Sequence, residues 1–186
     1  MPPTTTELAH EPSHSAPLLQ HLQRSHPKSQ IALLAFSDQE GVIEIARIGV
    51  PIHIERFEHI GLDLLGTQFL THSHPDALQA ERAIEHIENS IMPAHLDLRQ
   101  FHVFTADQPA QTLLSWVQSI NQQQHRVVNL DTIEACFNLY VKAALDGPHT
   151  VVLPKAEKLW AYLILLREAM HHLCIEQIHV LGTSGN

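Results

Sequence analysis

The sequence predicts one α/β domain whose sheet begins as a three-stranded antiparallel meander and continues with parallel strands. Two observations carry this prediction. Residues 30–57 contain three short apolar or alternating segments whose connections are only a few residues long, and such connections join antiparallel neighbours. Beyond residue 57, segments with helical periodicity separate short apolar strands, and helical crossovers return the chain in the same direction.

The three strands of the meander are expected at Gln30–Phe36, Val42–Ile48 and Ile52–Phe57. The first is a continuous apolar run, whereas the other two alternate apolar with polar residues, which is the period of a strand with one buried face. The following stretch, residues 58–66, contains two glycines and is expected to be a connection that crosses the sheet edge.

Four helices and two more strands are expected after the meander. The helices are predicted at residues 76–91, at 108–122, from Asp131 to just before Gly147, and at 155–173; the strands are predicted at 101–104 and 178–181. Asp76, which follows a proline, and Asp131 are the expected N-caps. This order of elements is typical of a ribonuclease H-like or actin-like domain, which would occupy residues 30–186.

Residues 1–29 are expected to form a flexible N-terminal segment because they combine five prolines with many serines, threonines and histidines. A short helix over residues 17–24, with a proline at its first position, is compatible with the sequence. Cys136 and Cys174 lie in apolar helical patterns and are expected to be free thiols of a reducing compartment. We therefore expect a cytoplasmic protein.

Charge and hydropathy exclude two classes of partner. The chain has 20 acidic and 11 basic residues, a formal net charge of −9, and no cluster of lysines or arginines. A phosphate backbone requires such a cluster, so nucleic acid is not an expected partner. No apolar run approaches the length of a membrane span, so no membrane association is expected either.

Three stretches carry a family pattern: residues 49–57 followed by Ile60 and Gly61, residues 69–70 followed by Pro75 and a helix, and residues 152–156 together with 175–180. They resemble the second domain of the exopolyphosphatase and guanosine pentaphosphate phosphohydrolase family, an actin-like domain. The resemblance runs from about Gln30 to the end of the chain, and it implies a phosphate site in the bend between the first two strands.

Both phosphate-binding loops of that family are altered in this sequence. The first family loop, D-x-G-G-G-S-x-E, is replaced by residues 35–41, where Asp38 and Glu40 would repel phosphate. The second loop, G-x-S-G-T, is replaced by residues 105–109, where Pro109 lacks an N–H. The family's catalytic carboxylate belongs to a sister domain. The resemblance therefore implies a degenerate relative without a catalytic residue.

The leading hypothesis is a non-catalytic protein that acts by association with a protein partner or as a homodimer, or by weak binding of a phosphorylated small molecule or nucleotide. The candidate ligand-binding residues lie in three loops expected beyond strand ends: Ser37, Asp38, Gln39, Thr105, Asp107, Thr183 and Ser184. An alternative is a polyphosphate or guanosine pentaphosphate hydrolase, dependent on magnesium, that completes its site by dimerisation.

A third hypothesis is a zinc hydrolase. His72, His74 and Asp76 form an H-x-H-x-D pattern that resembles the metal motif of metallo-β-lactamase-fold enzymes. That motif continues with a histidine, and this chain has Ala77 there. Among sixteen histidines the pattern also arises by chance, which leaves Asp76 as a helix cap.

The remaining polar residues have simpler interpretations. Glu44 and Glu168 are single carboxylates expected on solvated faces, and His171 and His172 are expected to cap the last long helix.

Overall fold

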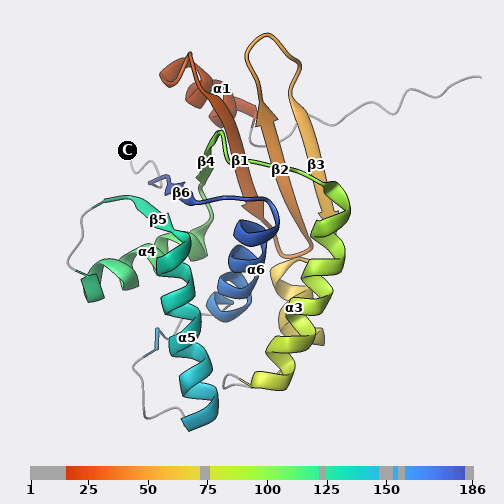
Figure 1. Cartoon of the computed structure of the whole chain (residues 1–186), viewed down its shortest axis with the longest axis vertical. Coiled ribbons are helices and arrows are strands. Elements are labelled where there is room, and N and C mark those ends of the chain that lie inside the picture. Colours follow the sequence, from red (N-terminus) through yellow and green to blue (C-terminus); the bar gives the residue numbers. More distant parts are fainter. Residues whose placement is uncertain (1–15, 72–75, 122–124, 147–152, 155–157, 183–186) are drawn as a thin grey trace, which may run out of the picture.

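The protein is represented by a computed structural model that describes residues 16–71, 76–121, 125–146, 153–154 and 158–182. Its centre is a mixed sheet of six strands in the order β3-β2-β1-β4-β6-β5 (Figure 1). The strands are β1 (Gln30–Phe36), β2 (Glu40–Ala46), β3 (His53–Glu58), β4 (Phe101–Thr105), β5 (Val127–Asn129) and β6 (Gln177–Val180).

The predicted meander is confirmed. β1 pairs antiparallel with β2, and β2 pairs antiparallel with β3. β4 then lies parallel to the other side of β1, and β6 lies parallel to β4. The sheet is therefore antiparallel on one side and parallel at its centre, as the short connections and helical crossovers predict.

Seven helical elements flank the sheet in the described part of the chain. They are α1 (Ala16–Ser25), α2 (Leu62–Gln68), α3 (Ala77–Ile91), the 3₁₀ turn η1 (Met92–Ala94), α4 (Gln108–Asn121), α5 (Leu130–Asp146) and α6 (Leu159–His172). Helix α6 lies between α3 and α5 (Figure 1). None of the described helices is both long and apolar enough to cross a membrane.

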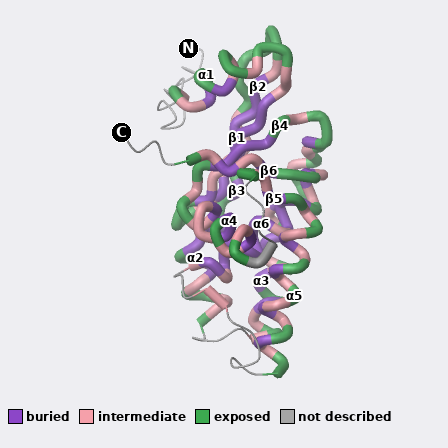
Figure 2. The backbone as a smooth tube through the Cα atoms, turned by 90° about the vertical axis from the view of Figure 1, so that its left-hand side faces the viewer, coloured by how far each residue is buried: buried purple, intermediate pink, exposed green. Residues whose placement is uncertain are grey.

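Both faces of β1 are covered, which explains why its sequence is a continuous apolar run. Ala32, Leu34 and Phe36 face the main core with α6, whereas Ile31 and Leu33 pack with Leu19 and Leu22 of α1. Buried residues follow the sheet, and the connection between β2 and β3 is exposed at the top of the view (Figure 2). Helix α1 corresponds to the short helix expected within the N-terminal segment, and its two buried leucines pack it against the sheet.

Three local features differ from the prediction. Asn129, not Asp131, caps α5, because the Asn129 side chain accepts the backbone N–H of Thr132 at 2.9 Å. Strand β5 was missed because it has only three residues; it pairs antiparallel with β6 at the sheet edge. Residues 62–68 form helix α2 in place of an irregular connection.

The topology distinguishes the two ends of the parallel strands. The carboxyl ends of β1, β4 and β6 meet at one edge because these three strands are parallel, and ligands bind at this edge in open α/β sheets. Helix α6 runs back from that edge, so its first residue lies beside the β1–β2 turn and its last residues lie at the opposite edge.

Candidate functional site

The carboxyl edge brings together the turn after β1 and the loop after β4. Asp107 accepts a hydrogen bond from the backbone N–H of Phe36 at 3.0 Å, and its own N–H donates to Thr105 Oγ1 at 3.2 Å. The predicted residues of these two loops therefore do lie next to each other. Thr183 and Ser184 lie outside the described residues.

The β1–β2 turn uses its hydrogen-bond donors internally. The N–H groups of Gln39 and Glu40 donate to Ser37 Oγ at 3.1 and 3.0 Å, and the Ser37 N–H donates to the carbonyl of Glu40 at 2.9 Å. Together with the bond from Phe36 to Asp107, four donors of this bend are engaged. An anion cradle needs free N–H groups that converge on one point, and these four N–H groups are not free.

Backbone hydrogen bonds attach the start of α2 to the turn. The N–H groups of Leu62 and Asp63 donate to the carbonyls of Ser37 and Asp38 at 2.9 and 3.1 Å. Gly61 lies so close that a Cβ atom there would be 2.3 Å from the backbone of Asp38 and Gln39. Gly61 belongs to the family pattern found in the sequence. The close contact with the turn explains why a residue without a side chain stands at this position.

Lys158 supplies the positive charge of this edge. Its Nζ lies 2.7 Å from carboxylate oxygens of both Asp38 and Asp63, and these hydrogen bonds, first that of Asp38, raise the pKa of the lysine above its usual range. The residue precedes α6 in a left-handed conformation, with φ of 64°. An ammonium group thus lies between the two carboxylates, so these residues do not fit a magnesium ion.

Asp107 has the most perturbed environment of the predicted binding residues. Burial raises its pKa from 3.8 to about 6, against the hydrogen bonds from Phe36 and Thr105. The neighbouring Thr105 and Tyr162 are fully buried, and the hydroxyl groups of both oppose the rise in the pKa of Asp107. Asp107 and Thr105 were expected at this site from the sequence, whereas Tyr162 was not, because helical periodicity does not show which loop a buried hydroxyl group approaches.

Asp76 is the one member of the H-x-H-x-D pattern that lies in the described part of the chain. Asp76 caps α3, as predicted: its side chain accepts the N–H of Gln79 at 2.9 Å. His72 and His74 belong to a stretch that the structure does not describe. The capping role of Asp76 and the actin-like sheet leave the zinc-hydrolase hypothesis without support.

The expectation of solvated single carboxylates was wrong for Glu44 and Glu168. Their exposed fractions are 3% and 2%. His171 and His172 lie in the last turn of α6, as expected, and they also contact Glu134 and Glu88 of the neighbouring helices. Sequence spacing places Glu168 and His172 on one helix face, but only the packing of α3 against α6 brings Glu88 to them.

Solved structures share this fold. No protein-family profile matches the chain, and no curated protein matches it either. The Ppx/GppA enzyme of Aquifex aeolicus aligns over 83% of this chain and 54% of its own, with a TM-score of 0.64 and 12% identity. An exopolyphosphatase of Cytophaga hutchinsonii aligns over 82% of this chain and 53% of its own, with a TM-score of 0.61 and 12% identity.

The chain therefore spans about half the length of these proteins. At this identity the likeness concerns the fold, and it agrees with the architecture predicted from the sequence. The protein is an α/β domain whose mixed six-stranded sheet and flanking helices match the actin-like fold of Ppx/GppA exopolyphosphatase structures.

Proposed function

We propose that this protein is a non-catalytic relative of the exopolyphosphatases that acts by protein association. The proposal rests on the hydrogen bonds of the β1–β2 turn, whose N–H groups already have acceptors within the protein. Ser37 Oγ accepts two N–H groups of the bend, and Asp107 accepts that of Phe36. Asp38 and Asp63 together carry one more charge than the Lys158 that lies between them. A phosphate chain entering the bend would therefore meet a net negative charge and no free donor among these groups.

The surface proposed for association is the exposed connection between β2 and β3. Ile48, Val50 and Ile52, here called the hairpin surface, are 64%, 52% and 43% exposed. Apolar side chains gathered at one exposed place mark sites of protein interaction. Between this connection and α1 lies an open groove of about 770 Å³, lined by Arg24, Arg47 and their neighbours.

A second copy of the chain is the partner proposed first. β3 is the end strand of the sheet, and an end strand offers unpaired backbone groups to another strand. It carries side chains of both signs, including Glu55 and Arg56. Two β3 strands placed antiparallel across a twofold axis would continue the sheet from one copy to the other, with the hairpin surface of each copy beside the carboxyl end of β3 in the other.

Sedimentation velocity tests this association. We expect the wild-type chain to sediment as a dimer at micromolar concentration and the double variant Ile48→Ser/Val50→Ser to sediment as a monomer. Leu145→Ser is the matched control, because Leu145 is 72% exposed at the end of α5, away from the hairpin surface. It should leave the dimer unchanged. A wild-type monomer at all concentrations tested would exclude self-association.

One observation favours the alternative of a hydrolase completed by dimerisation. Asp107, with its raised pKa, lies at the ligand-binding edge of the sheet, and perturbed carboxyl groups gather at catalytic sites. The two functions separate by assay of phosphate release from polyphosphate or guanosine pentaphosphate with added magnesium. We expect no release above that of an Asp107→Asn control. Release that this substitution abolishes would establish the hydrolase in place of our proposal.

A further inference from the structure

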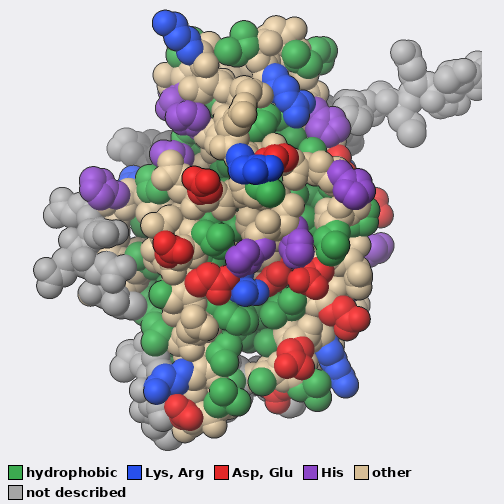
Figure 3. Space-filling view, viewed as in Figure 1, with side chains coloured by type: hydrophobic (Ala, Val, Ile, Leu, Met, Phe, Trp, Pro, Cys, Tyr) green, Lys and Arg blue, Asp and Glu red, His purple; other side chains and the backbone are tan. Residues whose placement is uncertain are grey.

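A group of charged side chains lies where α3, α5 and α6 meet, away from the β1–β2 turn. Acidic, basic and histidine side chains gather across the middle of this face of the molecule (Figure 3). The group comprises Glu88 from α3, Glu134 from α5, and Arg167, Glu168, His171 and His172 from α6. The proposed function uses none of these residues.

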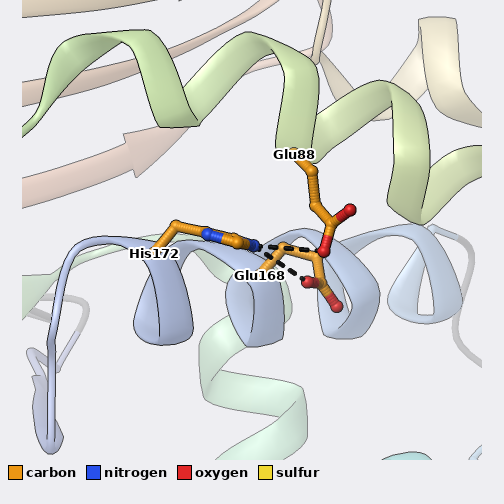
Figure 4. A group of neighbouring side chains, drawn as sticks. All are labelled: Glu88, Glu168 and His172. Carbon is orange, nitrogen blue, oxygen red and sulfur yellow. Dashed lines mark hydrogen bonds and ion pairs between the residues drawn. The ribbon is translucent and has the colours of Figure 1, made fainter.

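Three members of the group are placed as metal ligands would be. His172 Nε2 lies 3.2 Å from Glu88 Oε1 and 3.7 Å from Glu168 Oε2 (Figure 4). In a tetrahedral zinc site, ligand atoms about 2.0–2.2 Å from the metal are about 3.3–3.6 Å apart. One ligand atom from each residue lies within 4.8 Å of the others, so a small closure would place all three around one ion.

The net charge of this group also favours a bound cation. With neutral histidines, the group has the negative charges of Glu88, Glu134 and Glu168 against the single permanent positive charge of Arg167. Glu168 is only 2% exposed, and a carboxylate removed from water needs compensating charge. A divalent ion would balance the excess of two negative charges.

The surroundings suit a metal in two further respects. Arg167 hydrogen bonds to Glu168 Oε1, which leaves Oε2 directed to His172; such outer contacts orient the ligands of metal sites. The site is also open to solvent, because Glu88 and His172 are 39% and 25% exposed. An ion therefore has a path to the buried carboxylate.

We propose that Glu88, Glu168 and His172 bind a divalent transition-metal ion of the zinc type, with water completing its coordination. Two carboxylates and one imidazole form a mixed O/N ligand set that zinc accepts. Glu168 and His172 are four residues apart on one face of α6, and Glu88 comes from α3. The ion would join the two helices and stabilise the folded chain.

Zinc titration of chelator-treated protein tests this site, with affinity measured by competition against a chromophoric chelator and stability measured by thermal unfolding. We expect zinc to raise the wild-type Tm. Glu88→Gln and His172→Asn should abolish this rise and weaken the tightest zinc binding by more than about 100-fold, because loss of an outer contact alone costs about 10–100-fold. Unfolding in chelator shows whether each variant folds.

Two controls separate this site from other histidines. Glu85→Gln removes a charge from the same helix at an exposed position, and His72→Asn/His74→Asn removes the H-x-H pattern. Both should retain the tight binding and the rise in Tm. Retention of wild-type zinc affinity by folded Glu88→Gln and His172→Asn would overturn the proposal, as would a zinc effect that disappears only in the His72/His74 variant.

Discussion

Gly61→Ala is expected to lower the free energy of unfolding by about 3 kcal/mol, at the upper end of the range for an overpacked site. The new Cβ would lie 2.3 Å from the carbonyl oxygen of Asp38 and from the backbone of Gln39. Backbone atoms cannot rotate away as a side chain does, so the β1–β2 turn and α2 must separate. Gly61 has φ of −72°, which alanine adopts freely, so the loss would come from this contact alone.

Urea unfolding measures this effect, and Gly66→Ala is the matched control. Gly66 lies inside α2, five residues further along, and a Cβ there would meet nothing within 4 Å. Because alanine favours a helix over glycine by about 0.5–1 kcal/mol, this variant should be slightly more stable than the wild type. Equal stability of Gly61→Ala and wild type would show that the turn does not rest on α2 as described.

Asp107→Asn is expected to change the pH dependence of stability. Burial raises the pKa of Asp107 from 3.8 to about 6, so the folded protein binds this proton more tightly than the unfolded chain does. The stability contributed by the protonated carboxyl is fully present below pH 3.8 and is lost as the pH rises through 6. Asparagine does not titrate, so the variant should keep its stability as the pH rises.

Unfolding free energies at pH 4 and pH 8 test this expectation. Relative to the wild type, Asp107→Asn should gain about 2–3 kcal/mol between these two pH values, since each unit of pKa shift corresponds to about 1.4 kcal/mol. Asp97→Asn is a control without this gain: the side-chain hydrogen bond from Arg99 lowers the pKa of Asp97 from 3.8, so its titration lies below the interval from pH 4 to pH 8. The same pH profile for Asp107→Asn and wild type would contradict a buried carboxyl at this edge.

The sequence predicts the sheet well because strand pairing depends on local patterns. The apolar run Gln30–Phe36 and the short connections around it determine the meander and its direction, and Asp76 marks the start of α3. The prediction fails where a signal is short or has two interpretations: three residues of β5 carry no periodicity, and Asn129 competes with Asp131 as a cap.

The sites are less predictable because they join residues far apart in the chain. Sequence patterns placed Ser37, Asp38 and Asp107 at the ligand-binding edge, but they could not reveal that Lys158, 120 residues beyond Asp38, forms an ion pair with it. Likewise, the sequence indicates only that Glu168 lies on a helix face. Its neighbours become known only from the packing of α3 against α6. Burial and long-range pairing are properties of the packed fold.

We expect that the first bend of the sheet does not bind phosphate. Backbone amide NMR of Ser37 to Gly41 during titration with pyrophosphate measures this directly. We predict that these five amide signals stay in place, because Ser37 Oγ and the Glu40 carbonyl already accept three of their N–H groups. Saturable shifts confined to these amides would contradict the claim.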